Sequence, residues 1–425
     1  MSTSALRINY KSLIGGVSKV LAEHDGTLPG KRGAKRRAAK LISEAMDDPS
    51  VRASFDLGQM FAQLIGYQEF AMCRSDRSVN VNQVMEAAGG VSSDAFLTIT
   101  QQFIYSTVIP KYELPDFIFK AKIPTVPSPF RFEMIPGVSN IGDEATVVLE
   151  GDEFPYATPA EDIIRTPTTR KRGLQIPITK EAIFFDRTGL VVTRCSEVGE
   201  SLGVNREKRA INCIIDAGET PTAQYRYQWR GESTGLALTS IATYGANSGD
   251  HTWDNLATSN GLEDYNQINI AWQLLVAMTD PFTGLPIGSM FPPKDIIIPP
   301  SLVFQTPFSI GGQVRRMAPG YATSGNPTQT QVDASPTEKN LGQLNVMWSQ
   351  LLQQQMTAAG IAANAWWLGD ISKAFRYMEN WPMTVEQLGT GTQAEFSRDI
   401  VQQFKCSEQG SYATVQPRAV IENTP

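Results

Sequence analysis

Few residues in this sequence are suited to catalysis. It holds two histidines, His24 and His251, although histidine is the usual general base near neutral pH. The segment GESTG (231–235) matches the GxSxG pattern, in which Ser233 would be a hydrolase nucleophile on a turn between a strand and a helix. The preceding QYRYQW is polar, and no helix is predicted to follow. We expect a surface turn here, and a serine hydrolase using Ser233 is a distant alternative.

Two further patterns could bind a nucleotide or a cation. The segment GTGTQA (389–394) matches GxGxxA, but only 31 residues follow Ala394, too few for the βαβ unit that a dinucleotide fold requires. Glu150, Asp152 and Glu153 could bind a hard cation, although a solvated or salt-bridging loop is the favoured interpretation. No P-loop, HExxH or calcium-loop pattern occurs. The sequence therefore predicts no cofactor and no metal.

Cysteine spacing and hydropathy narrow the class of protein further. No CxxC pattern joins the four cysteines, which argues against a disulfide framework or a zinc site. They are Cys73, Cys195, Cys213 and Cys406. No run of about 18 apolar residues is present, so we expect no membrane span. The first ten residues lack a signal-peptide pattern, so we expect the protein to stay in the compartment where it is made.

The charge is unevenly distributed along the chain. Residues 1–40 hold nine Lys/Arg and two acidic residues, a net charge of +7, so the remainder carries −13 of the total of −6. A basic arm of this kind favours a polyanion such as DNA, or an acidic protein partner. The run that concentrates the charge contains Lys31, Arg32, Lys35, Arg36, Arg37 and Lys40.

Residues 124–178 are predicted to form a long β-hairpin. Strands are expected at 130–135 and 145–149, with a return strand over 161–178, and the intervening PGVSNIGDE is rich in turn-forming residues. A thin hairpin has little core of its own and must pack against another surface. Its acidic residues are Asp143, Glu144, Glu150, Asp152 and Glu153, and its return strand carries Arg165, Arg170, Lys171 and Arg172.

The rest of the chain alternates between helical and strand patterns. Apolar spacing predicts one long helix over about 188–217 and a shorter helix over 264–278. Short helices are expected before Asp47 and after Pro49. Strands are expected at 294–300, 343–348, 364–369 and 411–421, a closing helix at 393–404, and a long loop at 311–342 containing Arg315 and Arg316.

Three stretches and the order of these elements carry a family resemblance. They are LEGDEFPYATPAE (149–161), RKRGLQIPITKEAIFFD (170–186) and EFSRDIVQQFKCSEQGSYATVQPRAVI (395–421). Over about 100–421, the chain resembles the major capsid proteins of tailed bacteriophages of the Hong Kong 97 type.

This resemblance implies an α+β phage capsid fold in four regions. An N-terminal helical, basic arm would span 1–123, and the extended β-hairpin would form an extension loop at 124–178. A peripheral domain would combine 179–262 with 390–425 and contain the long helix at about 188–217 as a spine helix. A mixed α/β axial domain would span 263–389, with its 311–342 loop directed toward the centre of each hexamer or pentamer.

The resemblance also implies a function. The chain would be a non-enzymatic protein that self-assembles, as hexamers and pentamers, into the icosahedral shell enclosing phage double-stranded DNA. It would contact that DNA non-specifically through an inward basic arm, and its hairpin charges would pair between subunits. Scaffold, portal and decoration proteins are the other expected partners. Assembly would occur in the host cytoplasm, and the protein would reside in the virion. An encapsulin-type nanocompartment shell is the alternative, since it shares this fold.

Some members of the family join neighbouring subunits by a bond between a lysine on the extension loop and an asparagine. That reaction needs an amine that can lose its proton. No lysine occurs between Lys122 and Lys171, and arginine cannot substitute because it stays protonated. We therefore expect a shell held by non-covalent contacts.

Overall fold

The computed structural model describes the chain from residue 108 onward, with gaps, together with Lys40. The described ranges are 108–114, 116–137, 147–151, 153–154, 162–179, 190–217, 227–230, 239–245, 253–263, 265–280, 284, 286–287, 290–304, 314–316, 331–333, 344–388 and 400–425. The predicted N-terminal helices lie outside them, as do Ser233 and the 389–394 segment.

The chain divides into two compact units, each made of several segments. Unit 1 comprises Met1–Leu114, Lys171–Val204 and Pro382–Glu408. Unit 2 comprises Pro115–Arg170, Asn205–Trp381 and Gln409–Pro425.

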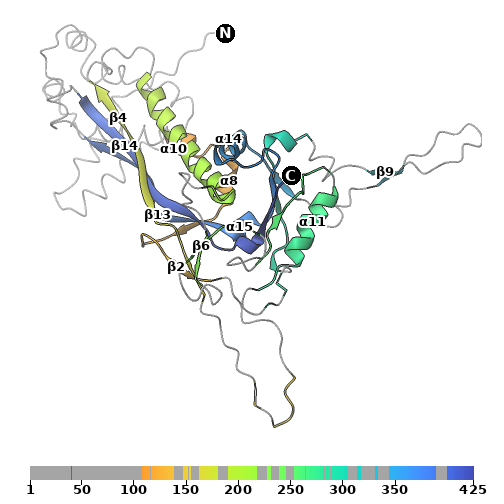
Figure 1. The fold of residues 1–425 in the computed structure, drawn as a ribbon. Helices are drawn as coiled ribbons and strands as arrows, with labels where there is room; N and C mark the ends of the chain where they lie inside the picture. The colour runs from red at the N-terminus through yellow and green to blue at the C-terminus, as the bar shows by residue number, and fades with distance from the viewer. Residues whose placement is uncertain are drawn as a thin grey trace, which may run out of the picture. The chain divides into compact units, whose positions relative to one another are not determined.

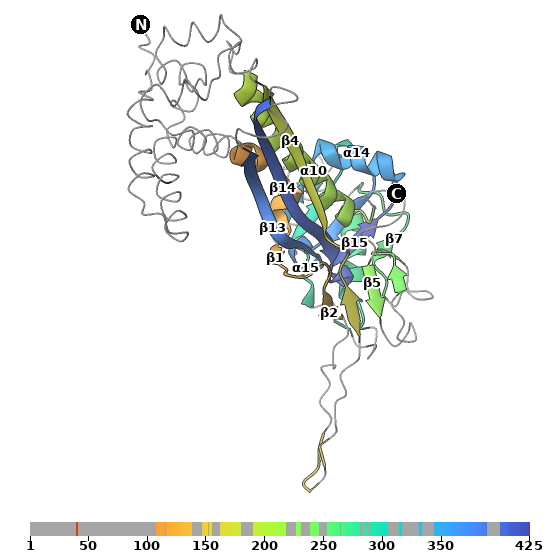
Figure 2. The same cartoon turned by 90° about the vertical axis from the view of Figure 1, so that its left-hand side faces the viewer.

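One sheet and one long helix each contain residues of both units. The sheet has the order β1-β13-β14-β4, and its strands are β1 (Thr125–Pro127), β13 (Phe375–Leu388), β14 (Ile400–Thr414) and β4 (Arg170–Thr179). Helix α10 (Leu190–Ile214) runs alongside the long strands (Figures 1 and 2). Within unit 1, a Cβ added at Gly199 would lie 2.5 Å from the Val108 carbonyl oxygen, so this helix requires glycine where it meets that backbone.

Unit 2 is built on a five-stranded mixed sheet with the order β11-β8-β12-β15-β7. The strands are β11 (Asn345–Met347), β8 (Asp295–Ile297), β12 (Trp366–Gly369), β15 (Val420–Asn423) and β7 (Leu256–Ala257). Helices α11 (Tyr265–Val276), α14 (Gln350–Ala359) and α15 (Ile371–Ala374) belong to the same unit. All residues of β8 and β12 are buried; they are apolar except for Asp295 at the start of β8, whose carboxylate pairs with Lys122.

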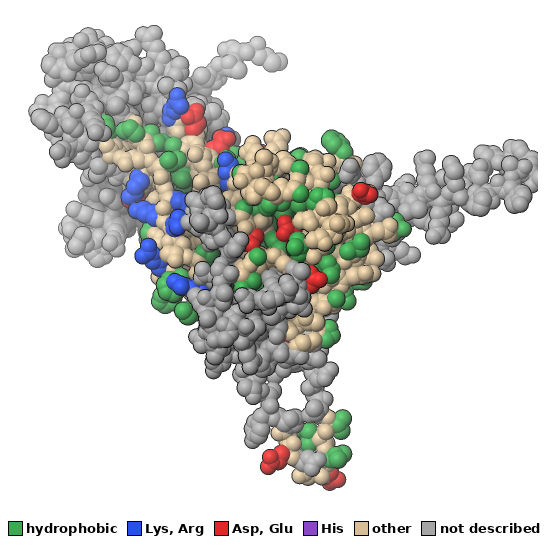
Figure 3. Space-filling view, viewed as in Figure 1, with side chains coloured by type: hydrophobic (Ala, Val, Ile, Leu, Met, Phe, Trp, Pro, Cys, Tyr) green, Lys and Arg blue, Asp and Glu red, His purple; other side chains and the backbone are tan. Residues whose placement is uncertain are grey.

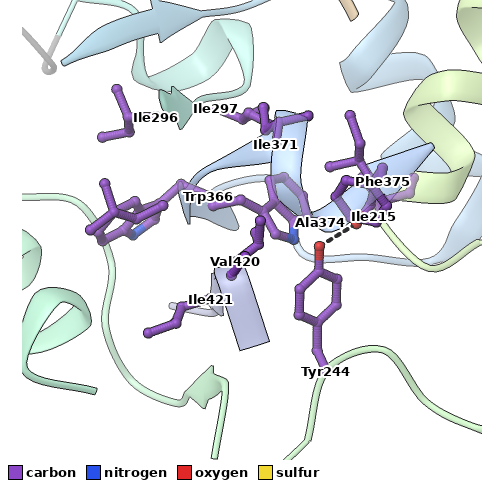
Figure 4. Packing of buried hydrophobic residues seen from close by; sticks show 14 of the residues in the cluster. Ile215, Tyr244, Ile296, Ile297, Trp366, Ile371, Ala374, Phe375, Val420 and Ile421 are labelled. Carbon is purple, nitrogen blue, oxygen red and sulfur yellow. Dashed lines mark hydrogen bonds between the residues drawn. The ribbon is translucent and has the colours of Figure 1, made fainter. Parts of the chain in front are cut away.

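The core of unit 2 surrounds this sheet. Trp366 lies among side chains of β8, α15 and β15 (Figure 4), and its indole N–H donates to the Asn260 carbonyl oxygen (2.8 Å). The Tyr244 hydroxyl donates to the Ile214 carbonyl oxygen (2.5 Å) at the end of α10. Both buried polar atoms are therefore satisfied, which allows these large rings to pack inside.

Two smaller sheets complete the described strands. One has the order β2-β3-β5-β6 and consists of β2 (Met134–Pro136), β3 (Ile163–Arg165), β5 (Tyr227–Arg230) and β6 (Thr239–Ile241). The other pairs β9 (Val314–Arg316) with β10 (Gln331–Asp333) in antiparallel register. Short helical turns occur at α8 (Ile118–Lys122), η3 (Pro300–Leu302) and η4 (Pro417–Ala419).

Several predicted elements are confirmed. The long helix expected over about 188–217 is α10, and the helix expected over 264–278 is α11. The strands expected at 294–300, 343–348 and 364–369 are β8, β11 and β12. The mixed helix and strand content agrees with the predicted α+β class.

Other predictions were wrong, each for a local reason. The closing helix expected at 393–404 is strand β14 from Ile400 onward, because this segment forms ladders with β13 on one side and β4 on the other. The loop at 311–342 contains the β9–β10 ladder. Residues 147–149 are not a strand.

The return strand over 161–178 is two strands, β3 and β4, separated by Thr166–Thr169. This interruption contains Pro167, which has no N–H to donate to a ladder. Strand β4 then pairs with β14 rather than with the hairpin. Among the described helices, none is long and apolar enough to span a membrane.

Candidate inter-subunit surface

The root of the predicted hairpin is a short antiparallel ladder in unit 2. Strand β2 pairs with β3 so that Met134 lies opposite Arg165 and Ile135 lies opposite Ile164. Ile164 is buried in the core. Because side chains alternate between the faces of a strand, Met134 and Arg165 lie together on the other face.

Side chains outside the ladder hold this root in place. The Asn380 amide donates to the Ser128 carbonyl oxygen (2.9 Å) and to the Phe130 carbonyl oxygen (2.7 Å). The Glu133 backbone N–H donates to the Thr166 hydroxyl (2.8 Å), and the Ser128 hydroxyl donates to the Glu133 carboxylate. The polar groups of the root are therefore used internally, and the chain leaves the sheet in a defined direction.

The outer face of the root exposes large apolar side chains. Phe130 is 64% exposed, Phe132 40% and Met134 62%. The Arg165 guanidinium lies 4.4 Å from the centroid of the Phe132 ring, a cation–π contact that holds its charge beside the apolar groups. We call Phe130, Phe132, Met134 and Arg165 the root patch.

A second group of exposed apolar side chains lies within the segment predicted to form the hairpin. Glu150 and Gly151 form a turn there, and Gly151 has φ +97°, a conformation that glycine adopts without strain. Val147 is 92% exposed, Leu149 70% and Phe154 80%. Hydrophobic and acidic side chains lie together on this part of the surface (Figure 3). We call residues 147–151 and 153–154 the tip.

The structure describes part of the predicted set of charged residues. Glu150, Glu153, Arg170 and Lys171 are exposed, whereas Arg165 and Arg172 are half-buried. Within unit 1, the charge of Lys171 helps Lys405, the main cause, to lower the pKa of Glu386. Lys40 is exposed and helical. The other predicted residues lie outside the described ranges: Asp143, Glu144, Asp152, Lys31, Arg32, Lys35, Arg36 and Arg37.

Two buried aspartates in unit 2, which the sequence patterns did not reveal, pair with more exposed lysines. Lys122 Nζ lies 2.6 Å from Asp295 Oδ1, and Lys294 Nζ lies 2.7 Å from Asp370 Oδ2. Burial acts to raise the pKa of Asp370, but the hydrogen bonds from Lys294 and Ser372 outweigh it and lower that pKa.

The most deeply buried pair joins η4 to a distant loop. Arg418 Nη1 lies 3.3 Å from Asp280 Oδ1, and both side chains are almost completely buried. A buried pair of this kind is costly to break from one side only. The pairing spans 138 residues of sequence, so no local pattern could have predicted it.

A coupled acidic pair lies where α10 ends. Burial, assisted by the negative charge of Asp216, raises the pKa of Glu422 to about 7. The Asp216 carboxylate accepts hydrogen bonds from the Thr243 N–H (2.8 Å) and hydroxyl (3.0 Å). Among the described residues, no three His, Cys, Asp or Glu side chains gather as a metal site would require.

Comparison with known protein families gives one match. A family model described as "Phage capsid protein" matches residues 164–423, which is more than half of the chain. No curated protein matches significantly.

Solved structures give weak overall similarities. The capsid of a native GTA particle aligns with a TM-score of 0.43 and 11% identity over 73% of this chain and 90% of that one. A structure from Mycobacterium phage Ogopogo gives 0.39 and 15% over 72% and 91%. A virus-like particle from Pyrococcus furiosus gives 0.39 and 8% over 75% and 97%.

Proposed function

This chain belongs to the phage capsid protein family, and we propose that it self-assembles as hexamers and pentamers into the icosahedral shell that encloses phage double-stranded DNA. The family match favours this function over an encapsulin-type compartment and over a serine hydrolase using Ser233. Its role in the virion is structural, and we propose that it has no catalytic activity.

The observation that best supports the contact between subunits is the hairpin itself. Its root is held by the ladder and by Asn380, while the tip exposes Val147, Leu149 and Phe154. Exposed apolar groups of this size are typical of interaction surfaces. A hairpin laid across a neighbour would bury them, and repeating that contact would close a shell.

The domain assignment follows from this proposal. The extension loop would be 124–178, the peripheral domain 179–262 with 390–425, and the axial domain 263–389. Helix α10 would then be the spine helix. The basic residues of the N-terminal arm, of which the structure describes Lys40, would face inward and offset part of the phosphate charge of the packaged DNA. Scaffold, portal and decoration proteins, and assembly in the host cytoplasm, belong to the same proposal.

Electron microscopy of the purified chain, expressed alone and with its scaffold, tests the proposed function. We expect capsomers or closed shells in at least one of these conditions. A chain that remains a folded monomer in both conditions would contradict the proposal.

Charge reversal tests the proposed pairing between subunits. The Arg170→Glu, Arg172→Glu variant should fold as the wild type does but assemble poorly, because it places acidic residues opposite an acidic hairpin. Arg194→Glu is the matched control, since Arg194 is an exposed arginine of α10 whose ion-pair partner, Glu197, lies on the same helix. Normal shell yield from the double variant would contradict the pairing.

A further inference from the structure

The tip and the root patch have matching chemistry. The tip combines three exposed apolar side chains with the acidic Glu150 and Glu153. The root patch combines three exposed apolar side chains with Arg165, and the exposed Arg131 lies within the same segment. Each surface therefore offers apolar area together with one sign of charge, and the two signs are opposite.

Both surfaces keep exposed apolar side chains within the described part of the chain. The exposed fractions of Val147 (92%) and Met134 (62%) leave most of both side chains in contact with solvent. Met134 of the root patch lies on β2, an outer strand of its sheet among the described residues, and Phe130 and Phe132 precede that strand, so a second chain could approach the patch from the side. Large apolar groups on an outer strand that stay uncovered are a liability for association with the wrong partner.

We propose that the tip of one subunit docks on the root patch of a second copy of this chain. Val147, Leu149 and Phe154 would pack against Phe130, Phe132 and Met134, while Glu150 and Glu153 would face Arg165 and Arg131. This inference rests on the proposed function and assigns the partner surface of the hairpin. It chooses a second copy because the chain itself supplies both complementary surfaces, one of each per subunit, as a head-to-tail contact requires.

Directed disulfide formation tests this contact. One chain carries Leu149→Cys and a co-expressed chain of different tag length carries Phe132→Cys. Both sites are exposed, so folding should be preserved, and only a contact between subunits can link the two chains. Assembled shells treated with a mild oxidant should give a mixed dimer that reductant reverses.

The matched control replaces Phe132→Cys by Val346→Cys, because Val346 is exposed to the same 40% but lies on β11. Each single variant and the wild type control for the native cysteines. Shells that give no more mixed dimer from the 149/132 pair than from the 149/346 pair would overturn the inference. Failure of the wild type to form shells would instead overturn the proposed function.

If the cysteine variants do not assemble, exchanging the charges of the tip and the root patch tests the same docking. The tip variant Glu150→Arg, Glu153→Arg and the patch variant Arg131→Glu, Arg165→Glu should each lower shell yield several-fold. The chain carrying all four changes should recover it. Unchanged yields in the two separate variants, or no recovery in the combined variant, would refute the docking.

Discussion

Replacing Glu422 by Gln should remove a pH dependence from the stability of this protein. Glu422 lies on β15, where burial and the negative charge of Asp216 raise its pKa from 4.5 to about 7. Because the folded state binds this proton more tightly than the unfolded state does, the stabilisation is complete below pH 4.5. It is lost as the pH rises through 7. The difference between the two pKa values corresponds to roughly 3 kcal/mol.

Urea unfolding of the unassembled chain between pH 4.5 and 8.5 measures this effect. Glutamine resembles protonated glutamate, so wild type and Glu422→Gln should differ little at the acid end. At pH 8.5 the variant should be more stable by roughly 3 kcal/mol. Glu386→Gln is the control. Glu386 is exposed and its pKa is lowered, so the difference in unfolding free energy between wild type and Glu386→Gln should stay constant above pH 5. A Glu422→Gln difference that does not change with pH would refute the reasoning.

Three further predictions concern packing and covalent state. Asp280→Asn should lower the free energy of unfolding by about 3–5 kcal/mol because it leaves Arg418 as a buried cation, while Asp280→Leu combined with Arg418→Met should recover most of the loss in urea unfolding. Gly199→Ala should destabilise the chain by about 1–3 kcal/mol, despite the better helix propensity of alanine, because its Cβ would lie 2.5 Å from the Val108 carbonyl oxygen. A melting temperature equal to or above that of the wild type would contradict this clash. On a denaturing gel, boiled and reduced mature particles should run as one band at or below 46.6 kDa. No lysine lies between Lys122 and Lys171 to form a bond between subunits, and Lys122 Nζ already pairs with Asp295 at 2.6 Å. A ladder of covalent multimers would contradict this prediction.

Local patterns in the sequence predicted the elements whose periodicity is strong. The apolar spacing of α10 and the run of three isoleucines at 296–298 each identify an element without knowledge of its neighbours. Strand β14 was mistaken for a helix because its N-terminal part also contains glutamine, lysine and phenylalanine at spacings that a helix tolerates. The segment forms a strand because it pairs with β13 on one side and β4 on the other. β4 lies more than 200 residues away in the sequence, so no local pattern shows that pairing.

The candidate site was predictable in outline but not in chemistry. The turn-rich segment and flanking strands indicated a hairpin, and the described part of it is the β2–β3 ladder, which pairs residues 134–136 with 163–165. The prediction emphasised charged pairs, whereas the described root presents Phe132 and Met134. An exposed phenylalanine in a strand looks the same in sequence as a buried one. Only the register, which places Ile164 in the core and Arg165 outside, separates the two faces.

A thin hairpin can position a contact far from its own core only if its root does not bend. Small changes of angle at the root become large displacements at the tip, so variation there would spread the tip over many positions on a neighbour. The two hydrogen bonds from the Asn380 amide and the one from the Glu133 N–H limit that variation. In the docking proposed above, the side chains that fix the direction of the hairpin are therefore not those that would touch the neighbour. A change at Asn380 would act on assembly through the direction of the hairpin, without removing any contact between subunits.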